Sequence, residues 1–463
     1  MTFSKKQSNF KAEMRNNVPE TGDNRSTRFK MCYVDHDTAL FRCAKFMQDD
    51  YIEVTHITSG NVKEFKNTTS FGVRAGKIIA VDVKKDVREK EGNPVKWLGW
   101  LNFDRIEKGL EPFRVEDFTI ESKSRLTSQC ETYEEALEKS MEIMDYTIGS
   151  IKRFMDSEDY ILCIGAGEGN YRDYECKDVI YKGNRDGKPL YFTEFRDVFL
   201  AKYGRKVIQA VNCEAEDLLQ HYANLELAEK GENFDNWEVC ASYIDKDVDH
   251  VYIPSFNYDN TDKGWRYPTK LECELCLAAQ TISGDPTDNI SGLPSLTDSV
   301  KEQFNLSKRK GATKSTATEI LEDSASIQEM WQRVIFCYQQ YYGIDTVHKF
   351  KDVHGSVQEW TWIDFMQQCY VLVRMQEYSG QIPCISTYLS KIGVSLGQVV
   401  FEVNEVIDQT ELRQQLSSVD DVYGSIQEKL KKFKSLSKKD LILRLESIAA
   451  DVCILGNNLN LLR

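Results

Sequence analysis

The segment Phe29-Lys-Met-Cys-Tyr-Val-Asp35 is a short apolar run that ends in an acidic residue. Such a run is typical of a buried strand with a carboxylate at its C-terminal end. Three similar apolar runs follow, separated by segments with helical periodicity, at residues 160–164, 206–211 and 239–244. Because the runs are continuously apolar rather than alternating, they predict a largely parallel sheet covered by helices on both faces. The expected fold class is therefore α/β.

Two helices and an insertion are predicted between the first two strands. Residues 38–47 and 131–154 have apolar side chains at helical spacing, and the second segment predicts a long amphipathic helix. Residues 51–130 differ in character, because β-branched runs at 54–62 and 77–83 are bounded by turn residues. We expect a mostly β insertion there.

Composition limits the class of protein. The chain has 463 residues, 41% hydrophobic and 29% charged, which suits two or three globular domains. It has no apolar run of membrane-spanning length and no signal peptide, so we expect a cytoplasmic protein without membrane contact. The 13 cysteines are expected to be buried free thiols, and Cys273 and Cys276, the only CxxC pair, to lie in a helix without zinc. A net charge of −14 argues against a general polyanion binder but not against a nuclease, which gathers carboxylates at its site.

The segment Gly284-Asp285-Pro-Thr-Asp288-Asn-Ile-Ser-Gly292 places two aspartates three residues apart after a predicted helix at 271–282. Alone, it is also an ordinary polar turn. Other acidic residues follow the predicted strands: Asp35, Glu214, Glu216, Asp217, Asp245 and Asp247. Ligands of parallel sheets lie beyond the C-terminal strand ends, and carboxylates gathered there repel one another unless a cation neutralises them.

Ligands that are all oxygen favour Mg²⁺ or Mn²⁺ over zinc. Two such ions can generate a hydroxide and stabilise the leaving oxygen of a phosphodiester, which requires about six to eight carboxylates. No Ser-His-Asp pattern is evident, so covalent catalysis is disfavoured.

A basic and aromatic segment accompanies the acids. It contains Asn170-Tyr171-Arg172 and Tyr181-Lys182-Gly-Asn-Arg185. Its cations can reach a scissile phosphate, and Tyr171 or Tyr181 can stack on an unpaired terminal base. The alternative is an ordinary basic surface loop.

Taken in order, these motifs resemble the 5′→3′ exonuclease and flap-endonuclease family in its bacteriophage form. Val34-Asp-His-Asp-Thr38 resembles the first-strand Asp motif, and the basic segment resembles the phosphate-contacting base of the helical arch. The acidic clusters at 214–217, 245–247 and 284–292 resemble the remaining metal-ligand motifs in the family's order. The match spans roughly residues 31–50 and 131–300.

The resemblance implies a role for each matching residue. The first metal would be held by Asp35, Glu214 and Glu216, with Asp217 acting directly or through water. The second would be held by Asp245, Asp247, Asp285 and Asp288. Lys182 and Arg185 would be the catalytic cations, and Arg172 a phosphate or structural contact.

The chain departs from the family pattern in two places. The second strand is followed by Gly165-Ala-Gly-Glu168-Gly rather than Asp, and Glu168 is one candidate substitute. The family's helix-two-turns-helix element repeats glycines and ends in Lys, which allows binding of a potassium ion, whereas this chain has Ser295, Thr297 and Ser299. Basic residues that can compensate in gripping DNA are Lys301, Lys308, Arg309 and Lys310.

The implied fold is a PIN-like α/β domain with a helix-two-turns-helix element. The expected parts are a flexible basic arm (1–30), a nuclease core (31–50 and 131–283), the β-rich insertion (51–130), the helix-two-turns-helix-like element (284–325), a helical C-terminal part (326–408) and a charged helical tail (409–463).

The expected function is a metal-dependent 5′ nuclease that acts on DNA duplexes with a 5′ end or 5′ flap. The segment from Tyr181 to Val207 is short for a threading arch, which favours exonuclease action. One alternative is a nucleic-acid-binding or regulatory protein with reduced catalysis, and another is a PIN-type ribonuclease. A phage origin would place the protein in the host cytoplasm, and the residues name no protein partner.

Overall fold

The computed structural model describes residues 27–82, 86, 96–165, 169–185, 187–376 and 380–401. The chain divides into two compact units, one made of Met1–Asp298 with Lys308–Gln398 and the other of Ser299–Ser307 with Val399–Arg463. The fold and the candidate site described below belong to the first unit. The expected N-terminal arm lies almost wholly outside the described residues, and the expected tail at 409–463 lies outside them altogether.

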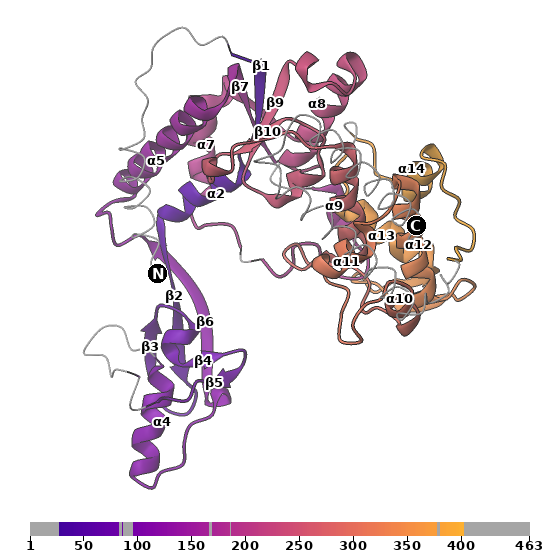
Figure 1. Ribbon diagram of the computed structural model, residues 1–463. Helices are drawn as coiled ribbons and strands as arrows, with labels where there is room; N and C mark the ends of the chain where they lie inside the picture. The colour runs from indigo at the N-terminus through magenta and orange to yellow at the C-terminus, as the bar shows by residue number, and fades with distance from the viewer. Residues whose placement is uncertain are drawn as a thin grey trace, which may run out of the picture. The chain divides into compact units, whose positions relative to one another are not determined.

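A six-stranded sheet forms the centre of the first unit, with strand order β11-β10-β9-β1-β7-β8 (Figure 1). Its strands are β1 (Phe29–Asp35), β7 (Ser157–Ile164), β8 (Val207–Gln209), β9 (Val239–Tyr243), β10 (Ser255–Asn257) and β11 (Trp265–Arg266). All neighbouring strands are parallel except the edge pair β10 and β11, which is antiparallel. The four predicted strands and the α/β class are confirmed.

Helices cover both faces of this sheet, because its central strands are apolar on both sides (Figure 1). The side chains of Cys32 and Val34 pack into a core with α2 (Asp37–Phe46), α5 (Tyr133–Phe154) and α7 (Phe192–Tyr203). Residues of opposite parity, such as Tyr33, pack on the other face with α8 (Ala215–Lys230). This two-sided burial is what a continuously apolar strand predicts.

The long helix α5 follows its predicted pattern closely. The Thr132 side chain accepts a hydrogen bond from the Glu135 backbone N–H at 3.2 Å and so caps the first turn. Ala136, Met144 and Ile151 lie on one face and are almost fully buried. The amphipathic interpretation is confirmed.

The insertion contains a three-stranded antiparallel sheet of β2 (Gln48–His56), β3 (Val62–Phe65) and β6 (Phe118–Leu126). Its other elements are the short strands β4 (Val73–Arg74) and β5 (Lys77–Ile78), helix α3 (Thr68–Phe71) and helix α4 (Trp97–Glu107). The sheet agrees with the β-rich prediction. Of the run expected at 77–83, residues 77–82 are described, and among them only Lys77 and Ile78 form a strand, β5. Helix α4 was not predicted.

The remaining elements follow β11. They are α9 (Lys270–Ser283), the hairpin β12 (Gly284–Asp285) and β13 (Ile290–Ser291), α10 (Asp298–Gln303), α11 (Lys314–Leu321), α12 (Ile327–Tyr342), the hairpin β14 (His348–Lys351) and β15 (Val357–Trp360), α13 (Trp362–Val373) and α14 (Ile385–Lys391). The C-terminal part at 326–408 was expected to be helical, and this expectation is wrong at the β14–β15 hairpin. One short helix, α6 (Tyr171–Glu175), lies in the basic segment.

Each cysteine in the described part is a free thiol, and most are buried. Cys273 and Cys276 lie in α9, as expected. Within the described ranges, no helix is both long and apolar enough to cross a bilayer.

Candidate active site

Asp35 is the last residue of β1 and is fully buried at the C-terminal edge of the parallel sheet. Its Oδ1 accepts a long hydrogen bond from the Asp37 N–H at 3.3 Å. Its Oδ2 has no hydrogen-bond partner in the described structure. Burial, followed by the negative charges of Asp37 and Asp245, raises the pKa of Asp35 well above its usual value. A bound cation would therefore favour the ionised form of Asp35.

Asp37 opens helix α2, and its carboxylate lies beside the end of the neighbouring strand β7. Both carboxylate oxygens accept from the Gly165 N–H, at 2.9 and 3.0 Å. Burial raises the pKa of Asp37 to about 6, although the Gly165 N–H opposes this effect. Asp37 is thus a second carboxylate, half-buried, that is hard to ionise.

Glu214 and Glu216 stand at the N-terminus of α8, where the helix dipole favours negative charge. Glu214 is the N-cap residue, and Glu216 lies in the first turn. Burial, and then the charge of Asp35, raises the pKa of Glu216. The negative charge of Asp37 also contributes to the raised pKa of Glu216.

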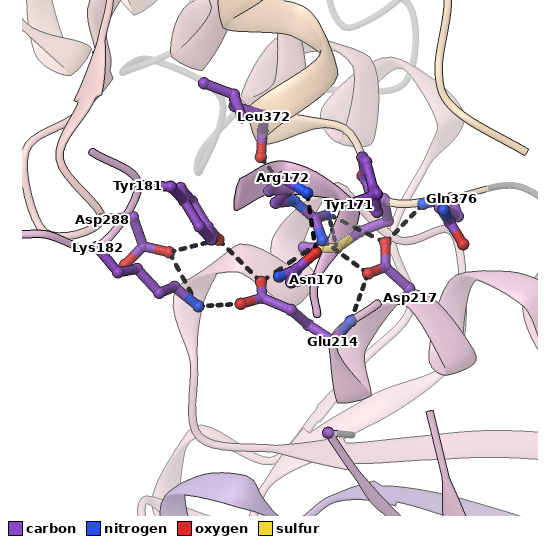
Figure 2. A network of polar contacts seen from close by, with 12 residues as sticks. Asn170, Tyr171, Arg172, Tyr181, Lys182, Glu214, Asp217, Asp288, Leu372 and Gln376 are labelled. Carbon is purple, nitrogen blue, oxygen red and sulfur yellow. Dashed lines mark hydrogen bonds and ion pairs between the residues drawn. The ribbon is translucent and has the colours of Figure 1, made fainter. Parts of the chain in front are cut away.

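Glu214 is neutralised by the chain's own cations, unlike Glu216. Lys182 forms an ion pair with Glu214, and the Tyr181 hydroxyl lies 3.0 Å from its Oε2 (Figure 2). Burial alone would raise the pKa of Glu214, but Lys182 and Arg172 lower it to about 2. Glu214 is therefore ionised in the absence of any metal.

The turn from Gly284 to Gly292 is a tight β12–β13 hairpin, and its glycines are required by close backbone approach. A Cβ on Gly284, whose φ is +65°, would lie 2.2 Å from the Ile290 carbonyl oxygen. A Cβ on Gly292 would lie 2.2 Å from the Ser283 carbonyl carbon. The glycine-bounded pattern therefore fixes the backbone that presents Asp285 and Asp288.

Both aspartates of this turn are paired with basic side chains. The Asp285 carboxylate lies 3.0 Å from Lys246 Nζ and 3.0 Å from Gln280 Nε2. Burial would raise the pKa of Asp285, but Lys246 and the Thr287 N–H lower it. Asp288 forms an ion pair with Arg185 and lies 3.4 Å from Lys182 Nζ.

The basic segment is fastened to the acidic turn by backbone contacts. The Lys182 N–H donates to the Asp288 carbonyl at 2.8 Å, and Asn184 Nδ2 donates to the Pro286 carbonyl at 2.7 Å. Asn289 Nδ2 donates in return to the Ile180 carbonyl at 2.8 Å. Two motifs about a hundred residues apart therefore form one surface, with Lys182 and Arg185 beside the carboxylates.

The cluster after β9 occupies the short helix η4 (Lys246–His250) and the residue before it. Asp245 interacts electrostatically with Asp35, as expected for a shared site. The side chain of Asp247 lies outside the described part, so its predicted role stays a prediction.

Arg172 and Asp217 form a buried ion pair, and Arg172 Nη1 also lies 3.6 Å from Glu214 Oε2 (Figure 2). Each side chain of the pair is 1% exposed, and the two make a bidentate contact at 2.7 and 3.0 Å. Asp217 also accepts from the Glu214 and Gln376 N–H groups, and Arg172 donates to the Leu372 carbonyl. The structural alternative for Arg172 is therefore supported over a phosphate contact. The prediction that Asp217 binds metal is wrong, because each of its oxygens accepts from Arg172 and from a backbone N–H.

The predicted base-stacking role of Tyr171 and Tyr181 is also wrong, because the two residues are only 6% and 7% exposed. The Tyr171 hydroxyl is directed at the Val371 and Arg374 carbonyls. The Tyr181 hydroxyl lies near Glu214 and Asp288. Both rings are structural parts that link the basic segment to the acids or to the α13 terminus.

The predicted DNA-gripping residues lie along α10 and the loop after it. Lys301 is in α10, which belongs largely to the second unit, whereas Lys308, Arg309 and Lys310 belong to the first. Lys308 and Arg309 are exposed, and Lys310 pairs with Glu319 at 2.6 Å. Their role and the helix-two-turns-helix assignment stay predictions.

Sequence reasoning missed two residues of the site. Asp37 belongs to the quoted first-strand motif, and its position at the start of a helix next to a strand end is the signal that would have revealed it. Lys246 lies between Asp245 and Asp247, and its pairing with Asp285 is a long-range contact that no local pattern reveals.

The donors described here are carboxylates, which suit Mg²⁺ or Mn²⁺, and the buried Asp35 Oδ2 has no hydrogen-bond partner in the described structure. Within the part of the chain that is described, no group of three or more acidic, histidine or cysteine side chains is placed so that it could hold a metal ion. Carboxylate oxygens are the type of ligand that a divalent ion prefers. Three of these carboxylates, Glu214, Asp288 and Asp285, form ion pairs with Lys182, Arg185 and Lys246.

No family model matches the chain, and no curated protein shows significant sequence similarity to it.

Proposed function

We propose that this protein is a metal-dependent nuclease with a PIN-like fold that hydrolyses DNA phosphodiester bonds at or near 5′ ends. The observation that carries the proposal is the Asp35 carboxylate, buried at the end of a parallel strand with one oxygen unpaired. Asp37, Glu214 and Asp245 add negative charge around it. Such a cluster destabilises a folded protein unless a cation enters it, so it favours a divalent metal site.

Two ions are proposed, in keeping with the resemblance stated above. Asp35, Glu214 and Glu216 would hold the first, and the second would take Asp245, Asp247, Asp285 and Asp288. When bound, the ions would lower the pKa of a water molecule and stabilise the leaving oxygen. A potassium ion at the element that follows Gly292 is part of the same family pattern and has weaker support, because Ser295, Thr297 and Ser299 replace its usual residues.

Lys182 and Arg185 are the proposed phosphate-binding cations. Each now pairs with a carboxylate of the site, Lys182 with Glu214 and Arg185 with Asp288. A phosphodiester bound by Lys182 and Arg185 would free Glu214 and Asp288 to bind the metal ions. Substrate binding and metal binding would then support each other.

Exonuclease action is favoured over the threading of long flaps. The segment that would form an arch contains α7, and its Phe195 and Phe199 side chains are completely buried in the sheet's core. A helix anchored in this way is part of the packed domain. The substrate proposed is accordingly a DNA duplex with a 5′ end, or a short 5′ flap.

A second candidate function is nucleic-acid binding or regulation with reduced catalysis. It is favoured by the ion pairs of Lys182, Arg185 and Lys246, which neutralise Glu214, Asp288 and Asp285 without a metal. A PIN-type ribonuclease is a third candidate, since no described residue distinguishes a 2′-hydroxyl.

The test uses 5′-labelled blunt, flapped and single-stranded DNA, together with RNA, in Mg²⁺ or Mn²⁺. The proposal expects metal-dependent cleavage of DNA that disappears in Asp35→Asn. Glu359→Gln is the matched control, because it removes an exposed carboxylate on β15. Duplex binding without cleavage of any substrate would favour the second candidate, and cleavage of RNA alone would favour the third.

A further inference from the structure

The space beside the end of β7 is occupied by a carboxylate from a different element. A Cβ built on Gly165 would lie 2.8 Å from Asp37 Oδ2 and 3.7 Å from its Cγ, and no atom outside Asp37 is among its three nearest neighbours. The Asp37 side chain therefore fills the position into which a side chain at residue 165 would project. The resemblance stated for this chain also implies an Asp near the end of the second strand, in the region that begins at Gly165.

The Asp37 carboxylate is held in that position by the β7 strand end itself. The Gly165 N–H donates to both of its oxygens, at 2.9 and 3.0 Å. Strands β1 and β7 are parallel neighbours, with Asp35 in register with Cys163. Asp37 belongs to α2, but its carboxylate occupies the position that a side chain at the end of β7 would occupy.

The surroundings of Asp37 favour a cation-binding role. The neighbouring Asp35 Oδ2 is completely buried and has no partner in the described structure. Glu214 and Glu216 interact electrostatically with Asp37. The hydrogen bonds from Gly165 leave lone pairs free on both Asp37 oxygens.

We propose that Asp37 is a metal ligand that supplies, from the first turn of α2, the carboxylate that the second strand lacks. The inference rests on the proposed function, because it assigns one more ligand to the same site. It also gives a reason for glycine at residue 165, because a Cβ there would lie 2.8 Å from Asp37 Oδ2 and the carboxylate would have to shift. Asp37 and Gly165 form an exchangeable pair, in which a carboxylate can come from either position.

The test transfers the carboxylate from one position to the other in the full-length chain. Asp37→Ser removes it, Asp37→Ser with Gly165→Asp returns it from β7, and Asp37→Ser with Gly165→Ala fills the same space without charge. The affinity for Mn²⁺ alone is measured by electron paramagnetic resonance titration, and circular dichroism confirms folding. We expect Asp37→Ser to weaken binding about tenfold or more. The aspartate double variant should recover affinity to within about threefold, whereas the alanine double variant should not.

Wild-type Mn²⁺ affinity in Asp37→Ser would overturn the inference, and so would equal affinities of the two double variants. A purely structural role for Asp37 predicts that the alanine variant restores the fold and the affinity as well as the aspartate variant does. Failure of the proposed function is a separate outcome: Mn²⁺ binding that follows the carboxylate while the wild type cleaves no nucleic acid supports the ligand role and rejects nuclease activity.

Discussion

The site has two sides that handle negative charge in different ways. On the strand side, Asp35, Asp37 and Glu216 have raised pKa values, and one Asp35 oxygen has no partner. On the turn side, Asp285 pairs with Lys246 and Asp288 with Arg185. The strand side is under electrostatic strain without a cation, whereas the turn side supplies its own cations.

This difference indicates where a metal has the most to contribute. A divalent ion on the strand side removes repulsion that the folded chain otherwise carries, so binding and folding are coupled there. An ion on the turn side must displace lysine or arginine from both Asp285 and Asp288, whereas the first ion competes with Lys182 only at Glu214. We therefore expect the first ion to bind more tightly than the second.

The largest effect is expected from Asp35→Asn, which removes the charge of the strand side while keeping its shape. Metal-dependent cleavage of 5′-labelled DNA should fall about 10³-fold or more. The metal-free variant should nevertheless be at least as stable as wild type, because Asp35 is costly to ionise in the fold. Activity and urea unfolding are measured on the same preparation. Retained cleavage would contradict the assignment of the strand side.

Arg172→Met should produce the next largest effect, and it should affect stability rather than catalysis directly. Arg172 and Asp217 are each 1% exposed, so removal of one partner leaves an unpaired buried charge. The expected loss is about 3–5 kcal/mol in the free energy of unfolding. Arg172→Met with Asp217→Leu should recover much of it in a denaturant titration. No recovery would show that the lost backbone contacts dominate instead.

The central sheet was predictable because each strand carries its own local signal. The segment that ends in Asp35 and the run before Gly165 are continuously apolar, and such runs identify buried parallel strands without knowledge of their neighbours. Helix α4 escaped prediction because its apolar face, with Leu98 fully buried, packs only within the insertion and follows no clear start signal. The hairpin β14–β15 is a pairing of two four-residue strands, which is too short for periodicity to detect.

For the candidate site, the positions of the residues at element ends were more predictable than their contacts. Chain order and spacing located Asp35 and the turn with Asp285, because both stand at element ends. The same patterns cannot distinguish a carboxylate that faces the site from one that faces a buried arginine, and Asp217 is of the second kind. Only burial and partners, which are long-range properties, separate it from Glu216.

A smaller effect is expected from pH acting on Asp37. Its pKa is about 6 in the folded protein and about 4 in an unfolded chain, so the folded state binds more protons between these values. The free energy of unfolding therefore falls as the pH rises from about 4 to about 6 and stays lower above it. Metal-free Asp37→Asn should lack this loss and gain up to about 3 kcal/mol at pH 8.

The control for this experiment is the difference between variant and wild type at each pH. His36 and His250 act in the opposite sense, because burial lowers their pKa to about 3 and acid therefore destabilises the fold through them. They are present in both proteins, so their contribution cancels. A difference that does not change with pH would contradict a half-buried, hard-to-ionise Asp37.

Addition of Mg²⁺ should stabilise the wild type by mass action, by about 2.7 kcal/mol at a hundred times its dissociation constant. Asp35→Asn should lose most of this gain, whereas Asp288→Asn on the turn side should lose less of it. Thermal unfolding with Mg²⁺ and then with EDTA measures the gain. Equal losses in the two variants would remove the distinction between the two sides.

The smallest effect is expected from Lys246→Met on the turn side. Lys246 is 50% exposed, so solvent screens its ion pair with Asp285 and the loss of stability should stay below about 1 kcal/mol. Because Lys246 and the Thr287 N–H lower the pKa of Asp285, their contribution is present at neutral pH and is lost as the pH falls below about 4. Urea unfolding should show a smaller difference between variant and wild type at pH 3 than at pH 7. A loss of several kcal/mol would mean that the turn side depends on its lysine as strongly as the strand side depends on a metal.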